Sequence, residues 1–125
     1  MAKSIHRYIR LMHVRSVRPS AGLWSPAADI FQRGNGWIVK LDLAGVIPDD
    51  VQICISGNTL RVSGVRRDTS FGEGIAYHQL EITYSRFEKI LQFPCSIEGA
   101  RVSRDYRDGL LILELRGGTD CEEEG

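Results

Sequence analysis

The sequence predicts an all-β protein, an antiparallel β-sandwich of seven to eight short strands. The main observation is that apolar and polar residues alternate through three runs within residues 37–65. Alternation with a period of two places one set of side chains on each face of a strand, so one face is suited to a core. The alternating apolar residues are Trp37, Val39, Leu41, Leu43, Val51, Ile53, Ile55, Leu60 and Val62.

Turn and breaker residues separate the predicted strands. Gly45 and Pro48 interrupt the first run, Gly57-Asn58 is a two-residue hairpin signal, and Asp108-Gly109 marks a last hairpin. Turn signals about every 8–12 residues, without a helix-length apolar pattern, indicate a sandwich or a barrel. The expected strands are 27–33, 36–44, 50–56, 59–66, 77–93 (one strand or a bent pair ending at Pro94), 100–105 and 109–115, with a long glycine-containing loop at 67–76.

Charge and composition divide the chain into three parts. We expect a flexible basic arm at 1–23, the sandwich domain at 24–116 and an acidic tail at 117–125. Residues 4–14 have an amphipathic pattern that fits either a short helix or an arm that becomes ordered only on contact. The Arg-rich, acid-free beginning also has some resemblance to an organelle transit peptide.

Composition also restricts the partners and the compartment. With 16 basic and 16 acidic residues the formal net charge is zero, so no overall field favours nucleic acid. The cysteines Cys54, Cys95 and Cys121 are odd in number and lack CxxC spacing. We therefore expect free thiols in a reducing, cytoplasmic setting rather than a disulfide framework, with Cys54 packing as a small apolar residue. No run of about 18 apolar residues occurs, so we expect no membrane span.

Known catalytic and metal-binding motifs have only weak matches in this sequence. The histidines His6, His13 and His78 lack metal-ligand spacing. The glycine-rich stretch 71–74 lacks the Lys-Ser/Thr pair and the helix of a phosphate-binding loop. Asp49-Asp50 follows a proline at the beginning of a strand, where a turn cap is favoured over an acid–base pair. We therefore predict a non-enzyme with no catalytic residues, no cofactor and no metal.

Four groups of residues, which follow one another along the chain, carry a more specific signal. The groups are Trp24-Ser25-Pro26 with Asp29-Ile30; Leu41-Asp42-Leu43-Ala44-Gly45-Val46 with Asp50-Val51 and Leu60-Arg61-Val62-Ser63-Gly64; Tyr77-His78 with Glu81, Tyr84, Phe87 and Phe93-Pro94; and Asp108-Gly109-Leu110-Leu111. In this order they resemble the α-crystallin domain of the small heat-shock protein family. The resemblance covers about residues 24–115 and implies an immunoglobulin-like β-sandwich.

The chain departs from the family pattern at several positions. Ala44 stands where the family usually has Pro, Ser85 where it has Gly, Lys89 where an Arg is common, and Arg104 at the Ala position of the last motif. The tail after Leu115 contains no Ile-x-Ile/Val motif. In the family this motif docks into a groove of a neighbouring dimer and builds large oligomers, so we expect a dimer or a small oligomer here.

The resemblance implies an ATP-independent holdase that binds partly unfolded client proteins and prevents their aggregation under stress. Strands 50–56 and 100–105 would flank a groove for clients or partners, because edge strands accept added strands. The expected groove residues are Val51, Ile53, Ile55 and Val102, although the pattern leaves open which of them face the core. The arm would capture clients through Ile5, Tyr8, Ile9, Leu11 and Met12.

The resemblance also implies a homodimer formed by strand exchange. By analogy with non-animal members of the family, the loop 66–80 would carry a short strand that pairs with strand 27–33 of the partner. The residues expected at this contact are Phe71, Ile75, Tyr77 and His78 in the loop, with Trp24 and Ile30 at the partner strand.

Two other functions stay open at this point. One is an adaptor sandwich of the co-chaperone type, which binds a larger chaperone and has little holdase activity. That type lacks the Trp-Pro strand and the long loop, so the sequence favours the holdase. The other is a membrane-surface or nucleic-acid binder that uses the basic arm, whose five charges would give only a weak, salt-sensitive contact.

Overall fold

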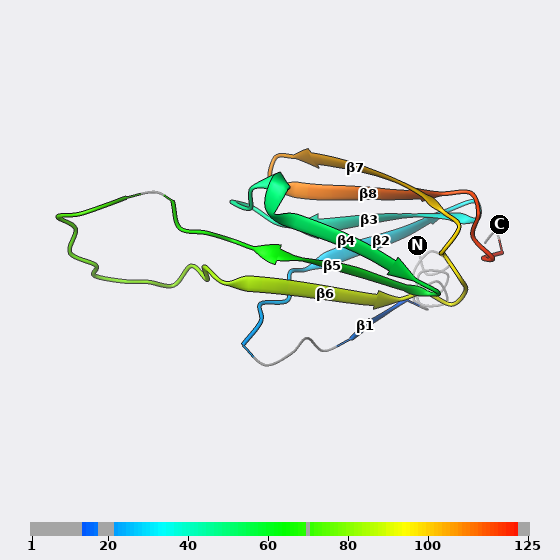
Figure 1. Cartoon of the computed structure of the whole chain (residues 1–125), viewed down its shortest axis with the longest axis horizontal. Coiled ribbons are helices and arrows are strands. Elements are labelled where there is room, and N and C mark those ends of the chain that lie inside the picture. Colours follow the sequence, from blue (N-terminus) through cyan, green and yellow to red (C-terminus); the bar gives the residue numbers. More distant parts are fainter. Residues whose placement is uncertain (1–13, 18–21, 70, 123–125) are drawn as a thin grey trace, which may run out of the picture.

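Two antiparallel four-stranded sheets stack on each other in the computed structural model, which describes residues 14–17, 22–69 and 71–122 (Figure 1). One sheet has the order β1-β6-β5-β4 and the other β2-β3-β8-β7. The predicted β-sandwich is therefore confirmed. The strands are β1 (Arg15–Val17), β2 (Ala28–Arg33), β3 (Gly36–Asp42), β4 (Val51–Ser56), β5 (Thr59–Val65), β6 (Arg86–Gln92), β7 (Arg101–Arg107) and β8 (Leu110–Arg116), with a 3₁₀ turn at Pro48–Asp50.

The alternating apolar residues form the core between the sheets. Those of β3, β5 and β8 are almost fully buried and meet the inner face of β6. Removing a large apolar side chain from water is worth about 1.5–3 kcal/mol, so this layer is the main stabilising feature of the sandwich. The buried apolar side chains of these four strands are Trp37, Val39, Leu41, Leu60, Val62, Phe87, Leu91, Leu111, Leu113 and Leu115.

Both predicted hairpin turns are present. Gly57 has φ +59° between the paired residues Ser56 and Thr59, and positive φ at the first central position is the pattern of a type II′ turn. Asp108 and Gly109 have φ values of +53° and +81°, the pattern of a type I′ turn. These turns match the right-handed twist of the strands, so they fix the β4–β5 and β7–β8 registers.

The expectation of strand structure throughout 77–93 is wrong. Only Arg86–Gln92 forms a strand, while residues 77–85 have no strand structure and are largely exposed. A strand needs a neighbour for its backbone N–H and C=O groups, and no described strand of this chain lies beside residues 77–85. The segment belongs instead to a long loop between β5 and β6 that extends well beyond the sheets (Figure 1).

The end of the predicted arm contributes a strand that composition did not indicate. β1 pairs with β6 from Arg15 opposite Gln92 to Val17 opposite Ile90. Further along, the backbone N–H of Trp24 donates to the Arg86 oxygen, and the Glu88 N–H donates to the Trp24 oxygen, both at 3.0 Å. The chain before β2 therefore covers the outer edge of β6. Three residues are too few to show periodicity in the sequence.

The expectation of three free thiols is also wrong. Cys95, in the β6–β7 connection, forms a disulfide with Cys121 in the tail, and their Cα atoms are 5.2 Å apart. The indole N–H of Trp37 donates to the Cys121 sulfur at 3.2 Å, and the Asp120 N–H donates to the Ser96 oxygen at 2.9 Å. The fold brings together two cysteines that are 26 positions apart, which spacing alone did not reveal. Cys54 is free but exposed, so it does not pack as an apolar residue.

The disulfide gives a stability prediction. Replacing both Cys95 and Cys121 by Ser should lower the unfolding free energy by about 3–4 kcal/mol under oxidising conditions, because the bond closes a loop across 26 positions. Urea unfolding followed by circular dichroism measures this difference. The exposed Cys54→Ser variant is the control and should stay within about 0.5 kcal/mol of the wild type. Identical unfolding midpoints for the wild type with and without dithiothreitol would contradict the prediction.

Candidate binding surfaces

The open sheet edges are the first candidate surface. β4 is an edge strand of one sheet, and β2 and β7 are the edge strands of the other. An edge strand presents unpaired backbone donors and acceptors, which attract an added strand. β4 and β7 line a common groove, so their edges lie near each other on one side of the sandwich.

The groove between β4 and β7 has a volume of about 630 Å³ and brings all four predicted groove residues together. Val51 is 5% exposed and belongs mainly to the core, whereas Val102 is 38% exposed. Ile53 and Ile55 are half-buried. They pack against the core and also line the groove. The groove floor is therefore apolar and continuous with the core of the sandwich.

Arg104 closes one end of this groove. Its Nη2 donates to the Pro48 oxygen at 3.0 Å and its Nη1 donates to the Val51 oxygen at 3.4 Å. The Val51 carbonyl thus points away from β5, and the alternation of an antiparallel strand turns the backbone groups of Ile53 and Ile55 the same way. The edge of β4 that remains open is short. In the sequence, Arg104 stands out only as a departure from the family pattern, and it was not among the predicted groove residues.

The long loop between β5 and β6 is the second candidate surface. Its large apolar side chains are exposed, with Phe71 82% and Leu80 73% accessible. A cluster of exposed apolar residues on one segment is characteristic of an interaction site. The predicted contact residues Ile75, Tyr77 and His78 lie on this loop and are also exposed. The predicted contact residues did not include Leu80, Ile82 and Tyr84, which are also exposed on this loop.

The two residues predicted on the partner strand lie in different places. Ile30 is in β2, where it is half-buried and packs against the core. Trp24 precedes β2 and forms a parallel bridge with Phe87 of β6, and its ring packs edge-on against the Phe87 ring at 5.6 Å. Trp24 therefore belongs to the β6 edge rather than to the strand that was expected to receive the loop.

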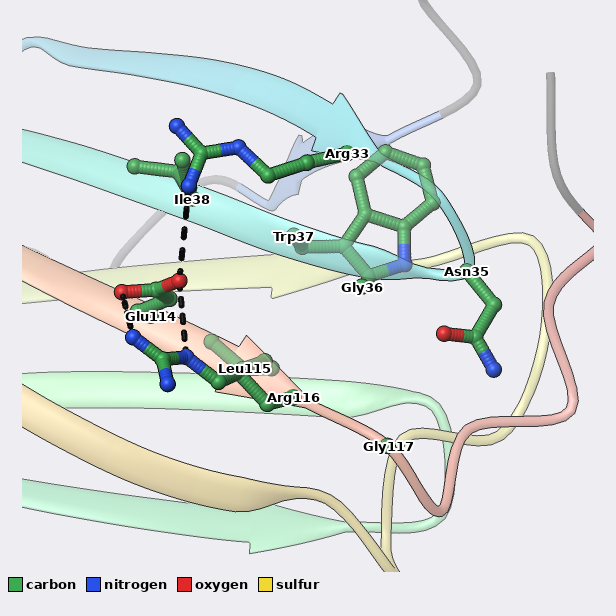
Figure 2. Close-up of a pocket in the computed structure, with 9 residues that line it drawn as sticks. All are labelled: Arg33, Asn35, Gly36, Trp37, Ile38, Glu114, Leu115, Arg116 and Gly117. Atoms are coloured by element: carbon green, nitrogen blue, oxygen red, sulfur yellow. Dashed lines mark hydrogen bonds and ion pairs between the residues drawn. The ribbon is translucent and has the colours of Figure 1, made fainter. Parts of the chain in front are cut away.

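A small charged pocket of about 310 Å³ lies at the ends of β2, β3 and β8 (Figure 2). Arg116 forms two hydrogen bonds with the Glu114 carboxylate, at 2.8 and 3.0 Å, and Nη1 of Arg33 is 3.7 Å from the same group. The hydrogen bonds from Arg116 hold the pKa of the Glu114 carboxyl below its ordinary value. This carboxylate therefore stays ionised between two guanidinium groups, an arrangement suited to an ion cluster rather than to proton transfer.

The described part of the chain does not support a metal site or a membrane-spanning helix. No group of three or more His, Cys, Asp or Glu side chains there could hold a metal ion. None of the helical structure in residues 14–17, 22–69 and 71–122 has the length and apolar character needed to cross a membrane. The predicted client-capture residues Ile5, Tyr8, Ile9, Leu11 and Met12 lie outside the described residues.

Comparison with known protein families agrees with the β-sandwich fold. A model of the Hsp20/alpha crystallin family matches residues 29–123. The chain belongs to this family. The resemblance inferred from the four sequence motifs is therefore confirmed.

Relatives within the Hsp20/alpha crystallin family extend the comparison. The chain is 24% identical to small heat shock protein C4 of Rickettsia felis over 91 residues, which cover 73% of this chain and 56% of that protein. It is 28% identical to spore protein SP21 of Stigmatella aurantiaca over 90 residues, 72% of this chain and 53% of that protein. The chain thus spans little more than half the length of these curated relatives.

A solved structure shows the same fold. Heat shock protein 16.0 from Schizosaccharomyces pombe superposes with a TM-score of 0.65 at 25% sequence identity, over 74% of this chain and 86% of that one. A β-sandwich is therefore the common framework of this chain and its solved relative.

The hydrogen bonds of Arg104 predict a modest structural role for this side chain. Arg104→Ala should lower the unfolding free energy by about 1 kcal/mol, because the variant loses hydrogen bonds to the Pro48 and Val51 carbonyls. Urea unfolding provides the measurement. Arg101→Ala, on the opposite face of β7, is the control and should stay within about 0.5 kcal/mol of the wild type. Equal losses of unfolding free energy in the two variants would show that the hydrogen bonds from Arg104 to Pro48 and Val51 contribute nothing to stability.

Proposed function

We propose that the protein is an ATP-independent holdase that binds partly unfolded client proteins and prevents their aggregation. Membership of the Hsp20/alpha crystallin family supports a chaperone role. The observation that carries the proposal is the apolar groove between two edge strands, which can accept an extended segment of another chain. Cytoplasmic localisation stays a prediction from the sequence.

Clients would bind at the β4–β7 groove through two kinds of contact. Unpaired backbone groups of β4 would hydrogen-bond the extended client segment, while Ile53, Ile55 and Val102 would contact its apolar side chains. Backbone pairing is independent of sequence, and a shallow apolar floor selects only weakly. Both features suit a protein that must bind many different unfolded chains.

The N-terminal arm would provide a second capture segment. Its apolar residues precede Val14, which packs against the core, and β1, which pairs with β6. The arm is thus joined to the domain at the β6 edge. The residues proposed to contact clients are Ile5, Tyr8, Ile9, Leu11 and Met12.

The long loop would form a homodimer by pairing with β2 of a second copy. Two observations support this proposal. The loop exposes large apolar side chains that have no strand beside them in the described part of this chain. β2 is an edge strand whose inner face is already packed, so an added strand would pair with its backbone without disturbing the core.

Suppression of thermal aggregation of a model client without ATP tests the holdase proposal. The full chain should suppress aggregation, and a variant that begins at Val14 should suppress it less, because it lacks the apolar arm but keeps β1. A variant that begins at Trp24 removes β1 as well, so a further loss would measure the contribution of that strand. Light scattering during heating is the readout.

Two matched substitutions on β7 separate the groove from the rest of the surface in the same assay. Val102→Glu places a charge in the apolar groove, whereas Ser103→Glu places the same charge on the opposite face of the strand. We expect weaker suppression from the first variant and wild-type suppression from the second. No suppression by the full chain at stoichiometric amounts would refute the holdase proposal and favour the adaptor type of sandwich.

Deletion of residues 70–78 tests the proposed dimer. The deletion removes Phe71, Ile75, Tyr77 and His78, so the remaining protein should be a soluble monomer by multi-angle light scattering. Val102→Glu is the control and should keep the wild-type molar mass, because Val102 lies in the β4–β7 groove and not in the long loop or β2. A deletion variant that stays dimeric would exclude dimerisation through this loop.

A further inference from the structure

The root of the long loop is organised around one side chain, that of Arg66. This residue directly follows β5 and is half-buried. Its backbone N–H donates to the Ser85 oxygen at 3.0 Å, and its Nε donates to the Thr83 oxygen at 2.8 Å. Arg66 therefore joins the two ends of the loop by both its backbone and its side chain.

The same guanidinium reaches two other parts of the chain. Nη1 donates to the Ala44 oxygen, in the β3–β4 turn, at 3.2 Å. The guanidinium carbon lies 4.0 Å from the centre of the Trp24 ring and 5.9 Å from that of Tyr84. A cation over an aromatic face at such distances is attracted to it, and Arg also stacks well on a ring. Trp24 is itself anchored to β6 by two backbone hydrogen bonds.

We propose that Arg66 is the positioning residue that holds the long loop in its extended orientation and so prepares it to pair with a second copy of this chain. The inference rests on the proposed dimerisation through the loop. Arg66 links the segment before β2, the β3–β4 turn and both ends of the loop. A loop fixed at its root loses less conformational entropy when its tip binds, which strengthens the association.

Arginine is suited to this position for a geometric reason. The planar guanidinium carries five N–H donors in one plane, so it can bond two carbonyl oxygens at its edge while its face lies on a ring. Lysine could approach the Trp24 ring but could not reproduce this combination. The adjacent Arg67 provides a contrast, because its Nε pairs with the Asp50 carboxylate at 3.0 Å and both side chains are partly exposed.

The test compares Arg66→Gln and Arg66→Lys with the neighbouring control Arg67→Gln. Sedimentation equilibrium gives the dimer dissociation constant of each protein. We expect Arg66→Gln to weaken dimerisation roughly tenfold, Arg66→Lys to have an intermediate effect, and Arg67→Gln to stay within about twofold of the wild type. The protection of the residue 66 amide against hydrogen exchange, measured in samples dilute enough to be monomeric, should be lower in Arg66→Gln, and to a lesser extent in Arg66→Lys, than in the wild type and Arg67→Gln, because this N–H donates to the Ser85 oxygen.

The outcomes separate this inference from the proposal on which it depends. A wild-type dissociation constant together with wild-type protection of the residue 66 amide in Arg66→Gln would overturn the role of Arg66. Equal weakening by Arg66→Gln and Arg67→Gln would overturn it as well, because the effect would then follow net charge. Lower protection of this amide in Arg66→Gln, with a wild type that is monomeric at every concentration, would support the anchoring of the loop and refute dimerisation. If Arg66→Gln is not folded by circular dichroism, the Arg66→Lys variant decides by the same criteria.

Discussion

The inner faces of the two sheets bury each other, and the exposed features of the molecule follow from this constraint. Apolar side chains from β3 and β8 face those from β5 and β6, and most of them are fully shielded from water. Such a layer fixes which face of each strand points inward, but it places no partner at the outer strands. Among the described strands, β2, β4 and β7, together with the three-residue β1, are therefore edge strands. The strands that complete the core thus create the surfaces available for binding.

Polar side chains stabilise the loops at the margin of this core. The β3–β4 turn is a junction at which several of them meet. The Leu43 oxygen accepts a hydrogen bond from the Tyr106 hydroxyl at 2.7 Å, and the Leu43 N–H donates to the Gly109 oxygen at 2.8 Å. The neighbouring Ala44 oxygen accepts from Arg66. A turn that the sequence marks only by Gly45 and Pro48 therefore connects β7, the last hairpin and the root of the long loop.

The tail is held against its own domain. Besides the disulfide between Cys95 and Cys121, the Gln32 side chain donates to the Glu122 oxygen at 2.7 Å, and the Thr119 hydroxyl donates to the Asn35 oxygen at 2.5 Å. These contacts cover the end of the sandwich near Trp37, which is 3% exposed. The groove between β4 and β7 and the long loop are left as the exposed apolar surfaces described above.

The sandwich, its alternating core and both hairpin turns could be predicted from the residues alone, because strand periodicity and turn chemistry are local properties. The sequence also indicated the groove residues Val51, Ile53, Ile55 and Val102, since edge strands and the family resemblance both pointed to them. The disulfide, the pairing of β1 with β6, and the start of β6 at Arg86 depend on tertiary contacts. Arg66 and Arg104 likewise acquire their roles from carbonyl groups distant in the sequence. Each of these features joins segments far apart in the chain, and no local pattern of residues records which distant segments will meet.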